Sequence, residues 1–220
     1  METEYKFGHY GDPHRVKWGA RMYVEDALFN GAVLMNGAKV KKVIIEDRIA
    51  IGVEFIKGGK KSKVLAPKVI ISAGGIGTPV ILRASGIQGA GYNFFFDPLI
   101  GVRGTAKDIN VPDSEIPMTA GVHVEDEDYM MTDFAQPSAF IALFAAEVGR
   151  FNKMFARRNT LQVFVKAKDA LGGRLTDSGG VRKNLDKNDK RKLLTGYERA
   201  KEILNNAGAK DIYKTWYIAT

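Results

Sequence analysis

The sequence predicts a mixed fold, α/β in its first part and α+β overall, and three observations lead to this expectation. A helical pattern that begins at Gly19 is followed by strand-like runs. An apolar run over residues 68–73 then passes through several glycines into a helix start. Strand-like segments follow between residues 119 and 168. With 45% hydrophobic and 26% charged residues, the 220-residue chain has the composition of a protein that buries a core.

The first part of the chain predicts one helix and several strands. Four apolar residues share one helical face: Ala20, Val24, Ala27 and Leu28. Asn30-Gly31 is typical of a helix end, and we expect this helix to pack on a sheet. The strands of that sheet are predicted over residues 32–35, 39–46 and 49–56. In the last run large apolar residues alternate with Ala50, Gly52 and Glu54, which predicts one buried and one lighter face.

The hairpin turn Gly58-Gly59 leads into a strand over 62–66, and the run 68–73 then predicts a strand covered on both faces. Three glycines follow it: Gly74, Gly75 and Gly77. Thr78 is the expected N-cap of the next helix, with Pro79 at its first position and Gly86 as its stop. This order directs backbone N–H groups and the positive end of a helix dipole beyond the strand, an arrangement that suits phosphates.

The second part of the chain predicts an antiparallel layer beyond a long irregular connection over residues 88–117. We expect β segments at 119–125, 129–135, 139–144 and 161–168, with a helix-like stretch around 146–156. The last helix has the clearest apolar stripe, formed by Leu193, Tyr197, Ala200 and Leu204 and ended by Ala207-Gly208. A strand over 212–218 closes the sequence.

Composition and charge narrow the classes of function. No apolar run reaches the roughly 20 residues of a membrane span, and the N-terminus lacks a secretory signal, so we expect a cytoplasmic protein. The net charge of +8 comes from residues 150–214, which hold 17 Lys and Arg against 7 Asp and Glu. Within it, Asp186 and Asp189 interrupt the basic stretch 182–192 and no aromatic residue interleaves that stretch, which favours a solvated helix face over a nucleic-acid site. Without cysteine, any redox chemistry must come from a cofactor.

Few side chains suggest acid–base or metal chemistry. His9 and His14 lie in an irregular lead-in and His123 lies within a predicted strand, so each is interpreted as structural or exposed. The acidic run 125–128 lacks the glycine and terminal glutamate of a calcium loop, which favours an acidic hairpin turn. The sequence contains no Gly-x-x-x-x-Gly-Lys-[Ser/Thr], Gly-x-Gly-x-x-Gly or Gly-x-Ser-x-Gly motif. A polar, glycine-rich turn over 172–180 is interpreted as a surface loop, with a ligand-cradling turn as the alternative.

The segment 71–87, Ile-Ser-Ala-Gly-Gly-Ile-Gly-Thr-Pro-Val-Ile-Leu-Arg-Ala-Ser-Gly-Ile, resembles the second signature of the glucose–methanol–choline (GMC) family of flavin-dependent oxidoreductases. The signature pairs a strand ending in Ala-Gly with a Thr/Ser-Pro helix start and a Ser-Gly-Ile stop. Gly75, Arg83 and Gln88 depart from its common residues. The upstream stretch resembles the part of the family in which a valine backbone contacts the adenine, and Val40 matches that valine by position.

The resemblance implies a partial FAD/NAD(P)-binding Rossmann-like domain over 1–90, a connecting loop over 91–117, an antiparallel substrate-domain sheet over 118–170, and a C-terminal helix and strand over 171–220. It implies FAD as cofactor and a small-molecule alcohol as substrate. The implied cofactor-binding residues are Val40, Ser72, Ala73, Gly74, Gly75 and Thr78. The family's Gly-x-Gly-x-x-Gly unit and its catalytic histidine segment have no counterpart here, so the chain resembles the central part of such an enzyme and no catalytic residue is assigned.

Two hypotheses of function therefore stand. In one, the chain is part of a GMC oxidoreductase and is catalytically incomplete alone, with a partner chain or oligomer supplying the other segments. In the other, it is a non-catalytic ligand-binding or interaction module on the same scaffold. His123 is a weak substitute for the missing base. Because the strand predicted over 68–73 lacks its usual neighbours, we also expect an exposed apolar edge there.

Overall fold

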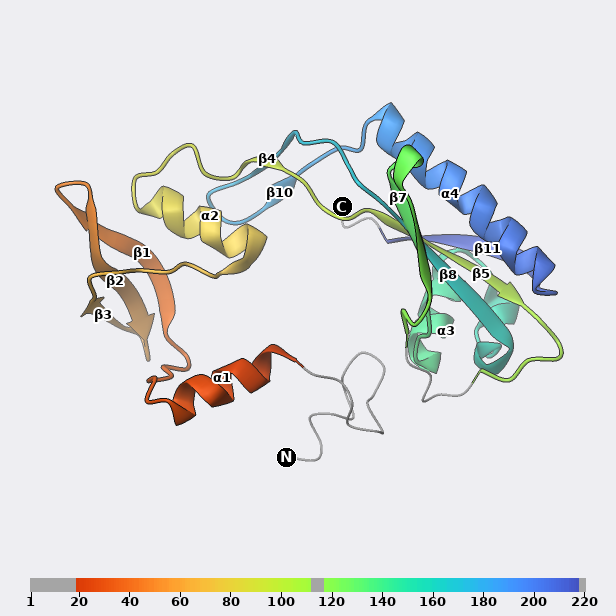
Figure 1. The fold of residues 1–220 in the computed structure, drawn as a ribbon, viewed down its shortest axis with the longest axis horizontal. Helices are drawn as coiled ribbons and strands as arrows, with labels where there is room; N and C mark the ends of the chain where they lie inside the picture. Colours follow the sequence, from red (N-terminus) through yellow and green to blue (C-terminus); the bar gives the residue numbers. More distant parts are fainter. Residues whose placement is uncertain (1–18, 112–116, 218–220) are drawn as a thin grey trace. The chain divides into compact units, whose positions relative to one another are not determined.

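A computed structural model describes residues 19–111 and 117–217, which form two compact units (Figure 1). Of the described residues, the first unit contains 19–95 together with 171–184. The second unit contains 96–170 and 185–217. The predicted C-terminal segment 171–220 is thus divided between the units. The predicted assignment of 1–90 to the cofactor and 118–170 to the substrate stays a prediction.

The first unit is built from two small antiparallel sheets and two helices. Helix α1 (Ala20–Phe29) precedes a sheet of order β1-β2-β3, made of β1 (Lys39–Glu46), β2 (Ile49–Lys57) and β3 (Lys60–Leu65). Helix α2 (Gly74–Ala84) follows. A second sheet of order β10-β9-β4 joins distant parts of the chain: β4 (Tyr92–Phe94), β9 (Gly173–Leu175) and β10 (Val181–Arg182).

The second unit is a five-stranded antiparallel sheet of order β11-β5-β8-β7-β6 with helix α4 (Lys187–Asn206) against it. Its strands are β5 (Leu99–Thr105), β6 (Gly121–Val124), β7 (Tyr129–Asp133), β8 (Thr160–Ala167) and β11 (Lys210–Tyr217). Helix α3 (Ser138–Glu147) and the 3-10 turns η2 (Glu125–Glu127), η3 (Phe151–Lys153) and η4 (Arg157–Asn159) complete it.

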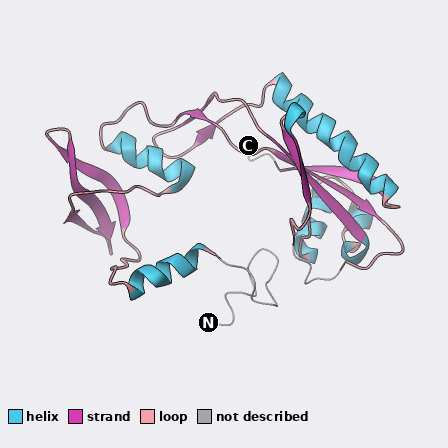
Figure 2. Cartoon of the chain, in the orientation of Figure 1, coloured by secondary structure: helices cyan, strands magenta, loops and turns pink. Residues whose placement is uncertain are grey.

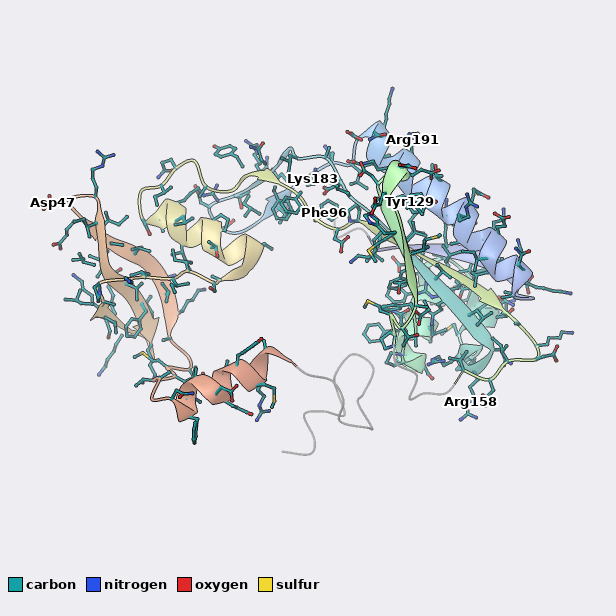
Figure 3. All side chains as sticks on the ribbon, viewed as in Figure 1. Asp47, Phe96, Tyr129, Arg158, Lys183 and Arg191 are labelled. Atoms are coloured by element: carbon teal, nitrogen blue, oxygen red, sulfur yellow. The ribbon has the colours of Figure 1, made fainter. Side chains whose placement is uncertain are left out.

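The core of the second unit lies between the sheet and α4. Alternate residues of β5, β7 and β8 face the helix, among them Val102, Val165 and Tyr129, the last of which is labelled in Figure 3. They meet the apolar stripe of α4, where Leu193 and Ala200 are fully buried. Asp186 caps the helix by accepting a hydrogen bond from the Asp189 N–H at 2.7 Å, and Asp189 reciprocates to the Asp186 N–H. Arg191, on the solvent side of α4, is exposed (Figure 3).

The mixed fold class is confirmed, as are the helix from residue 20, the strands over 39–46 and 49–56, the 58–59 hairpin and the helix ending at 207. The helix ending before Gly86 is also confirmed, although it begins at Gly74 rather than Pro79. Among the described residues, no helix combines the length and the apolar character that crossing a bilayer requires.

Several local predictions in the first unit are wrong, and for three of them the cause is a lack of packing partners. Helix α1 buries none of its residues, so it does not pack on a sheet. Residues 32–35 and 68–73 form no strand, because no described strand pairs with either segment; Figure 2 draws the second as a loop leading into α2. Ile70 in that loop is 90% exposed, which agrees with the expected apolar exposure. The lighter face of β2 is also more covered than expected, because β3 buries Gly52 and Lys61 covers Glu54.

In the second unit, the predicted strand 139–144 is part of α3, and the helix predicted over 146–156 is replaced by the end of α3 and the turn η3. A wholly apolar run carries no period that separates strand from helix, and the Ala and Leu residues of this run favour a helix. The connection 88–117 is not wholly irregular either, because it contains β4 and β5.

Candidate cofactor-binding site

A pocket of about 390 Å³ lies in the first unit, between the start of β1 and the loop 69–73. Val40, Ser72 and Ala73 line it, so the fold brings together three of the six predicted site residues from positions more than thirty apart. Gly74, Gly75 and Thr78 follow in the chain but are not part of the lining. The other lining residues are Ala38, Lys39, Val43, Val53, Val69, Ile70, Ile71 and Ile81.

The lining is suited to a largely apolar group. Aliphatic side chains from β1, β2, the loop and α2 supply most of it, and Lys39 and Ser72 are its two polar side chains. Ligand pockets in proteins are typically apolar, with a few polar groups that fix orientation. Backbone groups must therefore provide much of the hydrogen bonding in this pocket.

The backbone of Val40 is placed to do so by a β-bulge. Strand β1 is an edge strand, and the Val43 N–H points to its free side, where it donates to the Ser85 hydroxyl at 2.8 Å. In a regular strand the backbone groups of every second residue point to the same side, so those of Lys41 would point to the free side as well. The register shifts between Val40 and Lys42, however, so that Val40 opposes Phe55 and its N–H and C=O face the free edge. A free backbone edge that offers one N–H donor and one C=O acceptor can form a pair of hydrogen bonds with an adenine.

Helix α2 begins where the loop leaves the pocket. Gly74 has φ +74°, a conformation that favours glycine, and an added Cβ at Gly75 would meet no atom within 4 Å. Ala73 is the N-cap, so the predicted cap at Thr78 is wrong. Thr78 instead acts from inside the helix, where its hydroxyl accepts a hydrogen bond from the Ala73 N–H at 3.1 Å. The glycine turn thus leaves open backbone at the positive end of α2.

Ser85 connects α2 to β1, a role that the sequence signature did not reveal. Its hydroxyl accepts from Val43 N–H and donates to the Ile81 carbonyl at 2.7 Å. The same helix therefore contributes Ile81 to the pocket wall and is hydrogen-bonded to the strand that carries Val40. In the sequence, Ser85 only indicates the end of a helix. Its second role, holding α2 against β1, depends on its distant partner Val43.

Acid–base groups lie elsewhere. His123 is on β6 in the second unit with its side chain 63% exposed, and its Nδ1 is 4.0 Å from a Glu125 oxygen. His9 and His14 lie outside the described residues. Within the described ranges, no three His, Asp or Glu residues gather as a metal site would need.

The acidic run 125–128 has a structural partner. Lys192 donates to Asp128 at 3.0 Å, and its ammonium group lowers the pKa of Asp128 below the ordinary value. The sequence predicts that Lys192 belongs to a solvated basic helix face. That prediction is wrong for this residue, because Lys192 is buried.

Comparisons with known proteins agree with this arrangement. Residues 2–103 match the family model described as GMC oxidoreductase. A 53-residue stretch is 46% identical to the oxygen-dependent choline dehydrogenase of Photobacterium profundum, over 24% of this chain and 9% of that protein. The uncharacterized protein MJ1450 of Methanocaldococcus jannaschii is 29% identical over 157 residues, which are 71% of this chain and 40% of the relative.

The solved structure of pyridoxine 4-oxidase from Mesorbium loti shares the fold, with a TM-score of 0.57 and 14% identity. The match covers 85% of this chain and 42% of that one. The chain thus spans about two fifths of the length of MJ1450 and of the oxidase. The family match includes β1, the loop 69–73 and all of α2, which form the pocket and its glycine turn. Residues 2–103, a little less than half of the chain, are therefore similar to the GMC oxidoreductase family, which uses FAD as its cofactor.

Proposed function

We propose that the first unit binds the adenine end of FAD, as part of a GMC-type oxidoreductase that oxidises a CH–OH donor by hydride transfer to the flavin. The observation that carries this proposal is the pocket in which the outward-facing backbone of Val40 meets the loop 69–73. When bound, FAD would supply the hydride acceptor, so this chain needs neither cysteine nor metal for the redox step.

The residues of the first unit have separate tasks in this proposal. The Val40 backbone pairs with the polar edge of the adenine, and the aliphatic lining covers its faces. Ser72 and Ala73 close the pocket beside the ring. The positive end of α2 stabilises the negative charge of the pyrophosphate through the backbone near Gly74, Gly75 and Thr78.

We assign the second unit to the substrate side and propose that turnover needs an assembled enzyme. No catalytic base is assigned among the described residues. His123 stays a hypothesis for the base, and unchanged turnover of the assembled enzyme after its replacement would exclude it. The alternative of a non-catalytic module on this scaffold has no observation of its own and is an outcome of the test below.

The test is retention of FAD by the full chain. After incubation with FAD and removal of free cofactor, we expect a flavin band in the visible absorbance spectrum. Ala38→Phe, which places a ring in the pocket, should lose the band. Ala32→Phe makes the same substitution at an exposed position outside the lining and should keep it. A colourless wild-type chain would contradict the proposal and favour the non-catalytic module.

Fragments of the cofactor sharpen the test. If the pocket holds the adenine, AMP should compete with FAD for the chain, and FMN should not. Competition by FMN alone would move the site to the flavin end and remove Val40 from it. Equal failure of both fragments to compete would leave the pocket without a role in retention.

A further inference from the structure

Arg83 is a nearly buried arginine that the cofactor pocket does not use. It lies in the last turn of α2, its side chain is only 10% exposed, and it does not line the pocket. Burying a guanidinium is costly unless it is paired and hydrogen-bonded. Its placement therefore depends on the groups that it meets.

Those groups belong to residues 171–184, which we call the strap. Arg83 Nη1 donates to the Leu175 carbonyl at 2.8 Å, and Nε lies 3.2 Å from an Asp177 carboxylate oxygen. Nε and Nη2 are buried, and neither makes a hydrogen bond to a described residue. The strap therefore gives the arginine one hydrogen bond, from Nη1 to Leu175, and one ion pair, with Asp177, and both contacts join residues more than ninety positions apart.

The strap lies along α2 in the direction of the glycine turn. At one end Leu175 is 3% exposed and its N–H donates to the Gly91 carbonyl at 2.8 Å. Gly91, with φ +86°, leaves room there for Arg83 and Pro79, since an added Cβ would stand 3.3–3.4 Å from them. In Figure 1 the small sheet that contains β4 and β10 lies beside α2.

The tip of the strap, residues 176–180, reaches the first half of the helix. Gly179 packs there, because an added Cβ would stand 3.4 Å from Ile76 and 3.8 Å from Val80. The tip is itself fixed by hydrogen bonds: the Thr176 N–H donates to the Gly180 carbonyl at 2.7 Å, and the Gly180 N–H donates to the Thr176 hydroxyl at 2.8 Å. The strap is thus a formed turn, fastened at Arg83 and resting near the glycine turn.

We propose that Arg83 is a positioning residue for the cofactor site: it fastens the strap along α2 and so holds the helix whose first turn faces the pyrophosphate. The inference rests on the proposed function for its effect on FAD, but not for the fastening itself. Helix α2 is held on one side by the hydrogen bond between Ser85 and Val43 and on the other by the strap. Releasing the strap leaves one of these two supports.

The experiment compares the wild-type full chain with Arg83→Met and Asp177→Asn by amide hydrogen exchange and FAD retention. In Arg83→Met, exchange at Leu175, Thr176 and Gly180 should rise about tenfold or more, because a charged hydrogen bond and its buried partner are lost. The dissociation constant for FAD should rise at least about threefold for the same reason. Amides of the β2–β3 hairpin are the internal control and should not change.

Asp177→Asn is the milder variant. Its side chain is 93% exposed, so solvent screens the ion pair and strap exchange should rise less than in Arg83→Met, by about threefold. It also serves if Arg83→Met does not fold, because no strap-specific rise in Asp177→Asn would then overturn the proposal.

The remaining outcomes separate the two claims. Unchanged strap exchange in Arg83→Met, or an equal rise in the hairpin, would overturn the fastening role. A loosened strap with unchanged FAD affinity would overturn the positioning role alone. If the wild-type chain retains no FAD, the proposed function and the positioning role fail together, while the exchange data still decide whether Arg83 fastens the strap.

Discussion

The two units differ in how much apolar surface they bury. In the second unit, Ile100, Val102, Val165 and Leu193 are fully excluded from solvent between one sheet and α4. In the first, the apolar side chains that are buried among the described residues are Val43, Phe55 and Leu175. The unit that carries the cofactor pocket therefore has the smaller core, and more of its stability depends on hydrogen bonds such as those of Ser85 and Arg83.

This difference indicates what stabilises each unit. A five-stranded sheet covered by an amphipathic helix has a core of its own. A three-stranded hairpin sheet with exposed strands gains less from burial, and in the loop 69–73 Val69 and Ile71 are only half-buried while Ile70 is exposed. We expect the first unit to open locally at lower free energy than the second, and bound FAD to protect it.

The largest expected effect is in the core of the second unit. Leu193→Ala leaves a cavity beneath α4 and should lower the free energy of unfolding by about 3 kcal/mol. The matched control is its neighbour, Leu194→Ala, whose side chain is 44% exposed and should cost less than about 1 kcal/mol. Urea unfolding followed by far-ultraviolet circular dichroism measures both. Equal losses at the two positions would mean that the sheet and α4 are not packed as described.

The next effect tests the hairpin sheet of the first unit. An added Cβ at Gly52 would stand 2.2 Å from the Val64 carbonyl oxygen, so Gly52→Ala must push β3 away from β2. We expect a loss of about 1–3 kcal/mol, seen as faster amide exchange in β2 and β3 with α4 unaffected. Faster exchange in both units would show that they unfold together, against the comparison drawn above.

Part of the fold could be predicted from local sequence patterns, and part could not. Local patterns were enough for β1, β2, the 58–59 turn and α4, because alternation, turn glycines and a helical stripe act within a few residues. Whether residues 68–73 form a strand depends on a neighbouring strand, which no local pattern reports. Helix α3 was mistaken for a strand because a wholly apolar run has no period.

The candidate site divides in the same way. Family resemblance identified Val40, Ser72 and Ala73, which the fold brings to one pocket. It did not identify Ser85 or Arg83 as supports of α2, since their partners lie 42 and 92 positions away. Nor did it reveal the bulge that turns the Val40 backbone outward, because a bulge is a property of two paired strands.

A smaller effect distinguishes two glycines of the turn before α2. Gly75→Ala meets no atom within 4 Å and has no positive φ, so the first unit should become more stable by about 0.5–1 kcal/mol. Gly74→Ala keeps the same chemistry but needs φ +74°, and should destabilise the unit by about 1 kcal/mol. Exchange of the α2 amides measures both. The same sign at both positions would contradict the described start of the helix.

The smallest effect is electrostatic and belongs to the second unit. The hydrogen bond and charge of Lys192 hold the pKa of Asp128 below its ordinary value of about 3.8. A lowered pKa in the folded state adds stability above the unfolded value, and this stability is lost as pH falls through the folded pKa. Asp128→Asn should therefore be slightly less stable than wild type at pH 6, and the difference should be smaller at pH 2. Asp126→Asn removes the same charge from the same acidic run and is the control.

Because Lys61 lowers the pKa of Glu54 in the same direction, Glu54→Gln should show this pH signature in the first unit. Amide exchange at both pH values separates them: if Asp128→Asn altered the hairpin rather than α4, the contact with Lys192 could not be its cause.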